Sequence, residues 1–503
     1  MKCRRCGFDN PAGFAFCGKC GTPLSAGCPQ CGFENPEGFT FCGKCGASLT
    51  AVQDTLTSAD LDHLRAYLPS HLIEALRFDL SAPAPALLQK CIDHLSQLLG
   101  MIYTHLPPYL VEWVIQDPTP GRVGGQFMDG TLLFADISGF TAMSERLSRM
   151  GREGAEEINT IVNRYFSTML AILREHHGQL FEFGGDALLG IFPDPDSATR
   201  AVQAEQRMQE AMGAFSSTVT SQGDFEVQMK VGIHRGSFLA AQLGTPRGMK
   251  AALLGSVVSA TAATESAAEA GQILIDPKAL AAVSVPCRAR SAAVAPYQIV
   301  ERIEPATMLP HFPGPQRPYF PEPSLENLRR AVELLDGLAP YLQAGLLPRL
   351  ASDPHTASVQ GEHRLVSVLF ANVHGLGEIA DRLGPGREEE IIATLNRYFV
   401  AMEGAIHRFG GVVNTIDLNA HGDKLFASFG APQAHEDDAE RAVRAALAMQ
   451  ERMEELRTLP AEVGLDDLQL RQQIGISFGY VFAGFVGTNW RHDYTVMGDD
   501  VNL

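Results

Sequence analysis

Residues 130–140 read GTLLFADISGF, and this stretch decides the fold. The apolar run at 131–135 predicts a buried strand that ends at Asp136, and Gly139 marks a turn. Residues 141–147 have the pattern of the first turns of a helix. A carboxylate at a strand end beside a helix N-terminus is a place to hold a metal ion and the phosphates that it bridges. Taken alone, however, such an aspartate is better explained as a helix N-cap.

A second stretch, and a repeat of both stretches downstream, favour the metal site over the helix N-cap. Residues 183–192, FGGDALLGIF, predict a hairpin whose glycine turn carries Asp186. Far downstream, residues 369–375 (LFANVHG) repeat the first stretch and residues 421–430 (HGDKLFASFG) repeat the second. The chain is therefore predicted to hold two related halves, and Asn372 stands where the first copy has its strand-end aspartate.

These motifs resemble the class III nucleotidyl cyclases, and most of all the two-domain soluble adenylyl cyclases, whose second domain also carries Asn for Asp. The resemblance implies an α+β fold with two tandem ferredoxin-like cyclase domains, which form a pseudo-dimer within one chain. We expected helices mainly on one side of each sheet. The expected domains are a double zinc ribbon at 1–49, a helical linker at 50–127, a first cyclase domain at 128–303, a Pro-rich and helical connector at 304–360, and a second cyclase domain at 361–503.

Cyclising a nucleoside triphosphate requires the ribose 3′-oxygen to attack the α-phosphorus while pyrophosphate leaves. Two divalent ions on paired carboxylates lower the pKa of that oxygen and neutralise the phosphates. In the family, two aspartates of one domain and a backbone carbonyl bind both ions, which here implies Asp136, Asp186 and Ile137 with Mg²⁺ or Mn²⁺.

The resemblance also implies which residues bind the triphosphate. The backbone amides of Gly139, Phe140 and Thr141 are expected to hold the β- and γ-phosphates at a helix N-terminus. Lys230 stands where the family keeps a basic residue for the triphosphate. An exposed strand cation without such a role is an equally weighted alternative for this lysine.

The second domain is expected to complete the site. The resemblance places the ribose-binding asparagine at Asn502, whereas the arginine that follows in the family would fall past Leu503, so the chain looks like a fragment. Thr495 matches the position that accompanies adenine in the soluble adenylyl cyclases. The base-reading lysine falls near one of three residues, and the sequence does not decide which: Asn419, His421 or Lys424.

The mirror-image site lacks several of the groups that the family uses. In the first domain Ser259 and Ala263 replace the asparagine and the arginine, and Asn372 replaces one metal-binding aspartate of the second. We therefore expect one competent site per chain. Soluble adenylyl cyclases bind bicarbonate through a lysine and an arginine, but Glu182 and Ala263 stand at these positions, which predicts no bicarbonate activation there.

The N-terminal segment contains eight of the ten cysteines, in four CxxC pairs. Residues 6–21 and 31–46 are two copies of one unit, and the pattern resembles a double zinc ribbon with two Zn²⁺ ions. Recognition of a protein partner and a purely structural role are equally weighted for this unit. The expected zinc ligands are Cys3, Cys6, Cys17, Cys20, Cys28, Cys31, Cys42 and Cys45.

Composition limits the class of protein. The net charge of −18 argues against a general nucleic-acid or anionic-membrane binder. No apolar run is long enough to span a bilayer, and the N-terminus is not a signal peptide, so we expect a monomeric cytoplasmic protein.

The leading hypothesis is an adenylate cyclase, a phosphorus–oxygen lyase that converts ATP to cyclic AMP and pyrophosphate in signal transduction. A second hypothesis is a weak or inactive nucleotide-binding cyclase-homology module that regulates a downstream ATPase and repeat region. Asn372, Ser259 and Ala263 favour the second, whereas intact Asp136 and Asp186 disfavour it. A zinc-ribbon adaptor with the cyclase fold as scaffold has the least support.

Overall fold

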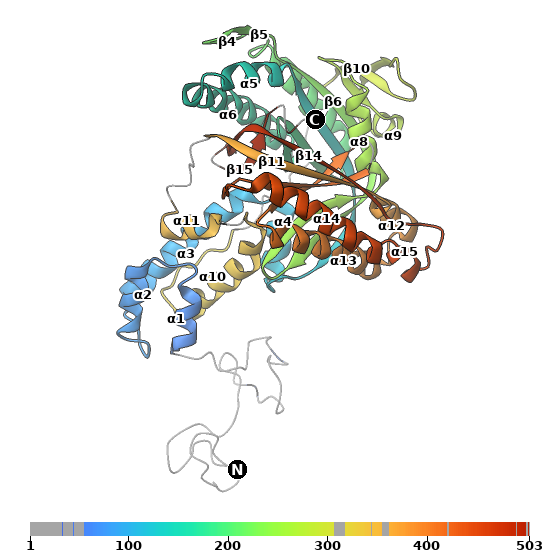
Figure 1. Ribbon diagram of the computed structural model, residues 1–503. Coiled ribbons are helices and arrows are strands. Elements are labelled where there is room, and N and C mark those ends of the chain that lie inside the picture. The colour runs from blue at the N-terminus through green and yellow to red at the C-terminus, as the bar shows by residue number, and fades with distance from the viewer. Residues whose placement is uncertain are drawn as a thin grey trace, which may run out of the picture.

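A computed structural model gives the arrangement of the chain (Figure 1). It describes residues 33, 44, 55–305, 317–343, 345–354, 362–419, 422–488, 490–498 and 501. The eight cysteines of the predicted zinc ribbons and Asn502 lie outside the described residues.

A helical layer is formed by two segments that are far apart in the sequence. Its members are α1 (Ser58–Leu64), α2 (Ser70–Arg77), α3 (Pro85–His105), α4 (Pro108–Gln116), α10 (Leu325–Leu338), η1 (Ala339–Tyr341) and α11 (Leu346–Ser352). The two segments share one apolar core, and Asp336 of α10 accepts a hydrogen bond of 2.6 Å from the hydroxyl of Tyr67. The helical periodicity over 61–76 is divided between two helices, because Pro69 caps α2 and cannot continue α1.

The first half of the chain, β1 to β10, forms an eight-stranded mixed sheet. Its strands run in the order β2-β3-β1-β6-β8-β10-β9, and β7 pairs with β6 outside this path. The strands are β1 (Gly124–Ser138), β2 (Gln179–Gly184), β3 (Ala187–Pro193), β6 (Gln228–Thr245), β7 (Gly248–Leu254), β8 (Ile273–Ile275), β9 (Cys287–Ser291) and β10 (Gln298–Ile303). A separate small hairpin consists of β4 (Thr218–Thr220) and β5 (Gly223–Phe225).

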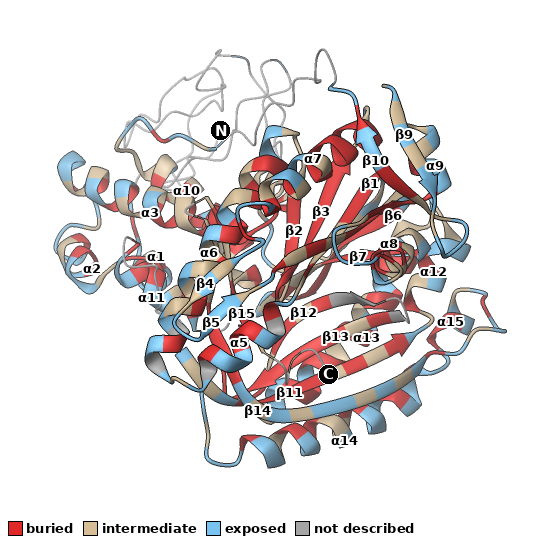
Figure 2. Cartoon of the chain, turned by 90° about the horizontal axis from the view of Figure 1, so that it is seen from above, coloured by how far each residue is buried: buried red, intermediate tan, exposed pale blue. Residues whose placement is uncertain are grey.

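Helices cover both faces of this sheet, which corrects the expectation of a single helical side (Figure 2). The helices are α5 (Phe140–Ser148), α6 (Arg152–Glu175), α7 (Ser197–Met212), α8 (Ser256–Ser266) and α9 (Pro277–Ala281). Val231 and Ile233 of β6 lie in one core with α6 and α7. Gly232, which points to the opposite face, leaves room for α8, because a Cβ there would lie 2.3 Å from the nitrogen of Glu265.

The second half of the chain, β11 to β15, repeats this plan with a five-stranded sheet in the order β12-β13-β11-β14-β15. The repeat predicted from the sequence is therefore present in the structure. Its elements are β11 (Glu362–His374), α12 (Leu376–Leu383), α13 (Glu388–Arg408), β12 (Val412–Asn419), β13 (Gly422–Phe429), α14 (Asp438–Leu456), α15 (Leu459–Glu462), β14 (Arg471–Thr488) and β15 (Arg491–Met497).

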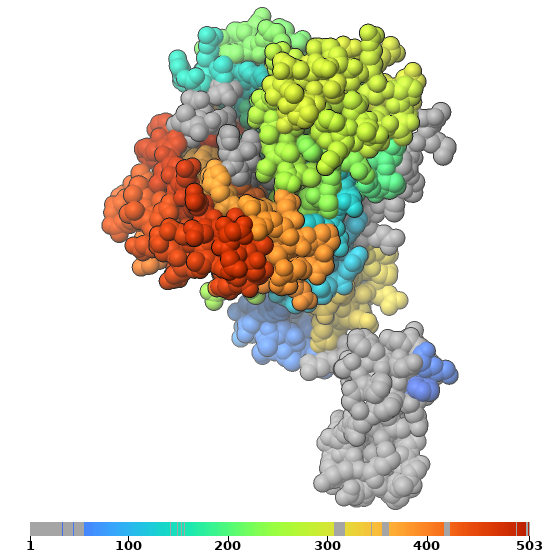
Figure 3. Space-filling model, turned by 90° about the vertical axis from the view of Figure 1, so that its right-hand side faces the viewer, coloured from blue at the N-terminus to red at the C-terminus, as the bar shows by residue number. Residues whose placement is uncertain are grey.

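The two halves lie against each other (Figure 3), and each contributes a long hairpin to the core of the other. The β6–β7 hairpin of the first half contributes Leu239, Leu243 and Leu254 to the core of the second. The β14–β15 hairpin of the second half contributes Phe482 and Val486 to the core of the first. Because each half completes the other's core, the halves form a reciprocal pseudo-dimer. Over the described ranges, no helix is both long and apolar enough to cross a bilayer.

Candidate active site

Strand β1 carries the first carboxylate. Asp136 lies inside β1, two residues before its end, so the sequence-based view that the strand stops at Asp136 is wrong. The strand extends because β6 pairs with it continuously, and Asp136 lies opposite Lys230 in that pairing. Asp136 is partly accessible, and it does not serve as a helix N-cap.

The β2–β3 hairpin brings the second carboxylate to the same place. Asp186 follows Gly185, which has a φ of 73°, and its side chain is buried. Burial, followed by the nearby charge of Asp136, raises the pKa of Asp186 to about 7. The predicted pairing of these two aspartates is therefore reproduced by the geometry, and their mutual repulsion is what a divalent cation between them would relieve.

Lys230 lies in the site and is not the exposed strand cation of the alternative interpretation. Its Nζ lies 2.7 Å from a carboxylate oxygen of Glu265 on α8 and 3.5 Å from one of Asp136. Burial alone would lower the pKa of Lys230, but the hydrogen bond and charge of Glu265, with Asp136, raise it. Glu265 is a residue that the sequence analysis missed, since only the packing of α8 on β6 places it here.

The turn after β1 starts helix α5 beside Asp136. Gly139 is the N-cap with a φ of 94°, and a Cβ there would lie 2.4 Å from the carbonyl oxygen of Glu226. Helix α5 begins at Phe140, whose ring is buried, so the first turn is anchored. The backbone of Thr141 belongs to this first turn, and no cap hydrogen bond from a side chain covers the helix N-terminus. The predicted phosphate-binding amides are thus placed at a helix start.

The donor set fits hard divalent cations. Among the described residues, no cluster of three or more His, Cys, Asp or Glu side chains is arranged to hold a metal ion. The site instead offers two carboxylates, Asp136 and Asp186, and the adjacent carbonyl of Ile137. Mg²⁺ prefers this kind of site, because it takes oxygen ligands, keeps several waters and shares the phosphates of its substrate.

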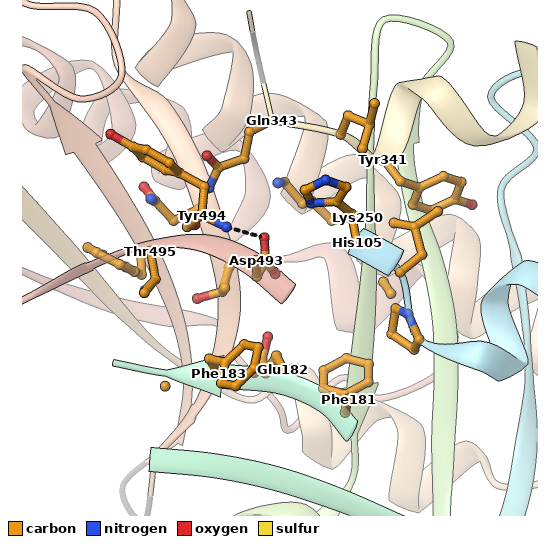
Figure 4. A pocket seen from close by; sticks show the side chains of 18 of the residues that line it. His105, Phe181, Glu182, Phe183, Lys250, Tyr341, Gln343, Asp493, Tyr494 and Thr495 are labelled. Atoms are coloured by element: carbon orange, nitrogen blue, oxygen red, sulfur yellow. Dashed lines mark hydrogen bonds between the residues drawn. The ribbon is translucent and has the colours of Figure 1, made fainter. Parts of the chain in front are cut away.

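A cavity opens beside Asp186 and runs between the halves (Figure 4). It encloses about 1070 Å³ of empty space, part of it open to solvent. Gly184 and Gly185 line it from the first half, and the outer end is formed by residues of the second half. These are Phe370, Asn414, Thr415, Lys424, Phe426, Thr495 and Val501.

The outer end contains some of the residues predicted to read the base. Thr495 on β15 is buried and lines the cavity. Of the three candidates for the lysine, Lys424 also lines the cavity, and its Nζ lies 4.4 Å from the centroid of the Phe370 ring. The strand pairing places Thr415 at the position equivalent to Glu182, so the second half has a hydroxyl at the register position of that buried carboxylate.

The mirror-image site is filled by the chain itself. Asp423, the counterpart of Asp186, accepts a hydrogen bond of 2.8 Å from the amide of Gly377 and is surrounded by apolar residues such as Leu254. Asp381 of α12 accepts a hydrogen bond of 2.8 Å from the amide of Ser256, at the start of α8. The start of α12, which is the counterpart of the phosphate-binding start of α5, thus already has its Gly377 amide bonded to Asp423, and the start of α8 is bonded to Asp381.

Comparison with known proteins agrees with this geometry. The chain matches the adenylate and guanylate cyclase catalytic domain over residues 125–299 and 359–503. It also matches the double zinc ribbon over residues 3–46, as the cysteine spacing predicted. A solved class III adenylyl cyclase-like ATP-binding protein from Pseudomonas aeruginosa superposes with a TM-score of 0.50 at 16% identity, over 82% of this chain and 88% of that chain.

Two kinds of relative are informative. Adenylate cyclase type 10 from Homo sapiens is 24% identical over 429 residues, which cover 80% of this chain and 25% of that protein. Adenylate cyclase 1 from Rhizobium meliloti is 30% identical over 176 residues, covering 35% of this chain and 25% of that protein. The chain thus spans about a quarter of the length of these relatives. With two matched segments, the repeated sheets and the paired aspartates, the chain belongs to the class III adenylate and guanylate cyclase family.

Proposed function

We propose that this chain is an adenylate cyclase, which converts ATP to 3′,5′-cyclic AMP and pyrophosphate at one site between its halves. The observation that carries the proposal is the pair of carboxylates, Asp136 and Asp186, beside Lys230 and the start of α5. A site without catalytic use has no physical need for two neighbouring acids whose like charges repel each other.

The residues divide the work as follows. Asp136, Asp186 and the carbonyl of Ile137 would hold two divalent cations, which would supply Lewis-acid activation of the ribose 3′-oxygen and charge neutralisation of the phosphates. The amides of Gly139, Phe140 and Thr141 hold the β- and γ-phosphates. Lys230 adds a positive charge for the triphosphate, and Glu265 orients its ammonium group. Asn502 positions the ribose.

Adenine is the base that the outer end of the cavity suits best. The exocyclic amine and ring nitrogens of adenine need a hydrogen-bond acceptor and a donor. The hydroxyl of Thr495 supplies the acceptor, and the ammonium group of Lys424 supplies the donor. The adenine ring would stack on the ring of Phe370, where the Lys424 ammonium now lies. A buried pair of this kind discriminates strongly against a base with the opposite pattern.

The test is product formation from ATP and from GTP, with Mg²⁺ or Mn²⁺, by the chain and its variants. Asp136→Asn and Asp186→Asn are each expected to reduce the rate on the order of 10²–10³-fold or more, as loss of one charged stabilising group does. Asp129→Asn is the matched control, because Asp129 is an exposed carboxylate on the same strand. Equal activity of Asp136→Asn and Asp129→Asn would contradict the proposal.

A regulatory nucleotide-binding module is the second candidate, and the observation in its favour is the loss of groups around the mirror-image site, notably Asn372 and Ala263. This candidate predicts ATP binding with no product. Binding of ATP that is abolished by Asp136→Asn, without cyclic AMP from the wild-type chain, would therefore favour it.

The remaining assignments are also proposals. We place the double zinc ribbon at 1–49, the cyclase domains at 128–303 and 361–503, and helical linkers at 50–127 and 304–360, in a monomeric cytoplasmic protein. Two Zn²⁺ ions in the ribbon are expected from its eight cysteines, and zinc analysis of the purified chain should give two per molecule, with serine at Cys3 and Cys6 reducing this to one. Recognition of a protein partner and a purely structural role remain equally weighted for the ribbon.

A further inference from the structure

The inner end of the cavity holds charged side chains of both signs. Lys250 on β7 and Asp493 on β15 are equivalent positions of the two exchanged hairpins, since each lies six residues after its hairpin glycine, Gly244 or Gly487. Figure 4 shows Lys250, Asp493 and Glu182 around one space, and Arg491 also lines it. A pair of equivalent residues with opposite charges therefore meets near the axis that relates the halves.

These charged side chains line the same space but do not form ion pairs with one another. In the part of the chain that the structure describes, the Lys250 side chain has no hydrogen bond, and no ion pair joins Asp493 to Lys250 or to Arg491, whose side chain donates only to backbone carbonyls. Burial lowers the pKa of Lys250, and the nearby charge of Asp493 opposes this effect without cancelling it. Separated charges in a half-buried space are costly unless a polar group lies between them.

A buried histidine from the helical layer also lacks hydrogen-bond partners in this cavity. His105, the last residue of α3, is only 5% exposed, and neither ring nitrogen has a hydrogen-bond partner among the described residues. The Nε of Arg491 is in the same state, although its two terminal nitrogens donate to backbone carbonyls. Two buried polar groups that line one cavity thus lack partners, which a bound molecule would provide.

The remaining wall of the inner end is apolar and comes from the helical layer. Leu106 and Leu110 follow His105, and Tyr341 and Leu346 come from the second linker segment. All four side chains are buried. A molecule seated here therefore needs an apolar part in addition to its charged part.

We propose that the inner end of the cavity binds a small zwitterion with an aliphatic side chain, of the α-amino acid class. Its carboxylate would meet Lys250 and an N–H of His105, its ammonium group would meet Asp493, and its side chain would pack on Leu110 and Leu346. A simple anion is disfavoured by Glu182 and Asp493, and a simple cation by Lys250 and Arg491.

The site shares Glu182 with the mirror-image site, but it is separate from the cavity around Asp423, Leu254 and Tyr398, which encloses about 330 Å³ of empty space. It is continuous with the outer end, because Gly184 and Gly185 line the same cavity next to Asp186. An effect of the zwitterion on turnover rests on the proposed cyclase function, whereas its binding does not. We therefore test binding without nucleotide, so that failure of either proposal is recognised separately.

The first experiment compares three ligands of one shape on the whole chain by thermal unfolding and calorimetry. L-leucine carries both charges, 4-methylpentanoate lacks the ammonium group, and 3-methylbutylamine lacks the carboxylate. L-leucine at about 10 mM is expected to raise the Tm, and the other two to leave it unchanged. No shift with L-leucine, or an equal shift with either half-ligand, would overturn the proposal.

The second experiment locates the bound molecule. Lys250→Met should weaken L-leucine binding roughly tenfold or more, as expected for loss of a charged hydrogen-bond partner, and Asp493→Asn should do the same. Lys278→Met, which removes an exposed lysine on α9, should bind like the wild type. Unchanged binding by both site variants, each checked for a wild-type circular dichroism spectrum, would show that L-leucine binds elsewhere and overturn the assignment.

Discussion

At the scale of single residues, Asp186 makes stability depend on pH. Its pKa is raised to about 7 by burial and by the charge of Asp136, whereas an unfolded aspartate titrates near pH 4. Between these values the folded chain holds a proton that the unfolded chain has lost, so stability contributed by this group is present below about pH 4 and is lost as the pH rises towards 7. The metal-free protein should therefore lose up to about 4 kcal/mol across this window.

The measurement is urea unfolding in EDTA at several pH values between about 4 and 8. Asp186→Asn, which cannot ionise, should weaken the pH dependence and leave the part contributed by other buried acids, such as Asp423, whose pKa burial raises to about 6. The exposed control Asp129→Asn should keep the full dependence. Added Mg²⁺ should stabilise the wild type more at the alkaline end, because the ionised pair binds it. A pH dependence that is the same in all three proteins would refute this assignment.

Gly139 is a second residue with a testable role, because its backbone conformation leaves no room for a side chain. Its φ of 94° and the Cβ contact of 2.4 Å with the carbonyl oxygen of Glu226 exclude a side chain. Gly139→Ala should cost at least about 1–3 kcal/mol of stability and displace the start of α5, with loss of triphosphate binding. Gly345→Ala is the control, because Gly345 is also a left-handed N-cap, with a φ of 84° at the start of α11, but has no atom within 4 Å of the added Cβ. It should cost only about 1 kcal/mol and keep nucleotide affinity.

At the scale of elements, the exchanged hairpins are held by one asparagine each. The amide of Gly244 on β6 donates to Asn396 of α13 at 2.6 Å, and that of Gly487 on β14 donates to Asn163 of α6 at 3.0 Å. These asparagines begin the same sequence, NRYF, at 163–166 and at 396–399, and this repeat thus has a structural reason. Each asparagine fixes the hairpin of the opposite half.

We expect Asn396→Ala to loosen the β6–β7 hairpin. It removes two hydrogen bonds, since the Asn396 side chain also donates to the carbonyl oxygen of Gly244, and should cost about 1–2 kcal/mol. Hydrogen exchange of the Gly244 amide should accelerate, and activity should fall because the site is built from both halves. Ser167→Ala, an exposed change on α6, should alter neither. Unchanged protection of Gly244 in Asn396→Ala would contradict the clamp.

At the scale of the whole molecule, the sequence pattern predicted the features that depend on residues close together in the sequence. The apolar run before Asp136, the glycine turn at Asp186 and the repeat with Asn372 were predicted correctly, because strand, turn and repeat are local signals. The extension of β1 to Ser138, the ion pair of Lys230 with Glu265 and the approach of His105 to the cavity were not. Each of these depends on a strand or helix from a distant segment, which no local pattern encodes.

The same scale decides how many nucleotides one chain holds. Two halves with one fold would give two nucleotide sites, but the chain's own carboxylates already occupy the second. Asp381 occupies the start of α8, and Asp423 is tied to the amide of Gly377. Restoring the lost carboxylate with Asn372→Asp should therefore not create a second site, since the space and the anion-binding amides are already used.

Titration with Mg²⁺ and 3′-deoxy-ATP, which lacks the attacking hydroxyl, should give one nucleotide per chain for the wild type. Asn372→Asp should also bind one, and Asp136→Asn should bind none or far more weakly, because charge neutralisation of the triphosphate depends on the metal ions that Asp136 helps to hold. Two nucleotides per wild-type chain would mean that Asp381 and Asp423 leave the amides of Ser256 and Gly377 in solution. In that case the asymmetry between the halves would lie in catalysis and not in binding, and the exchanged hairpins would serve two working sites.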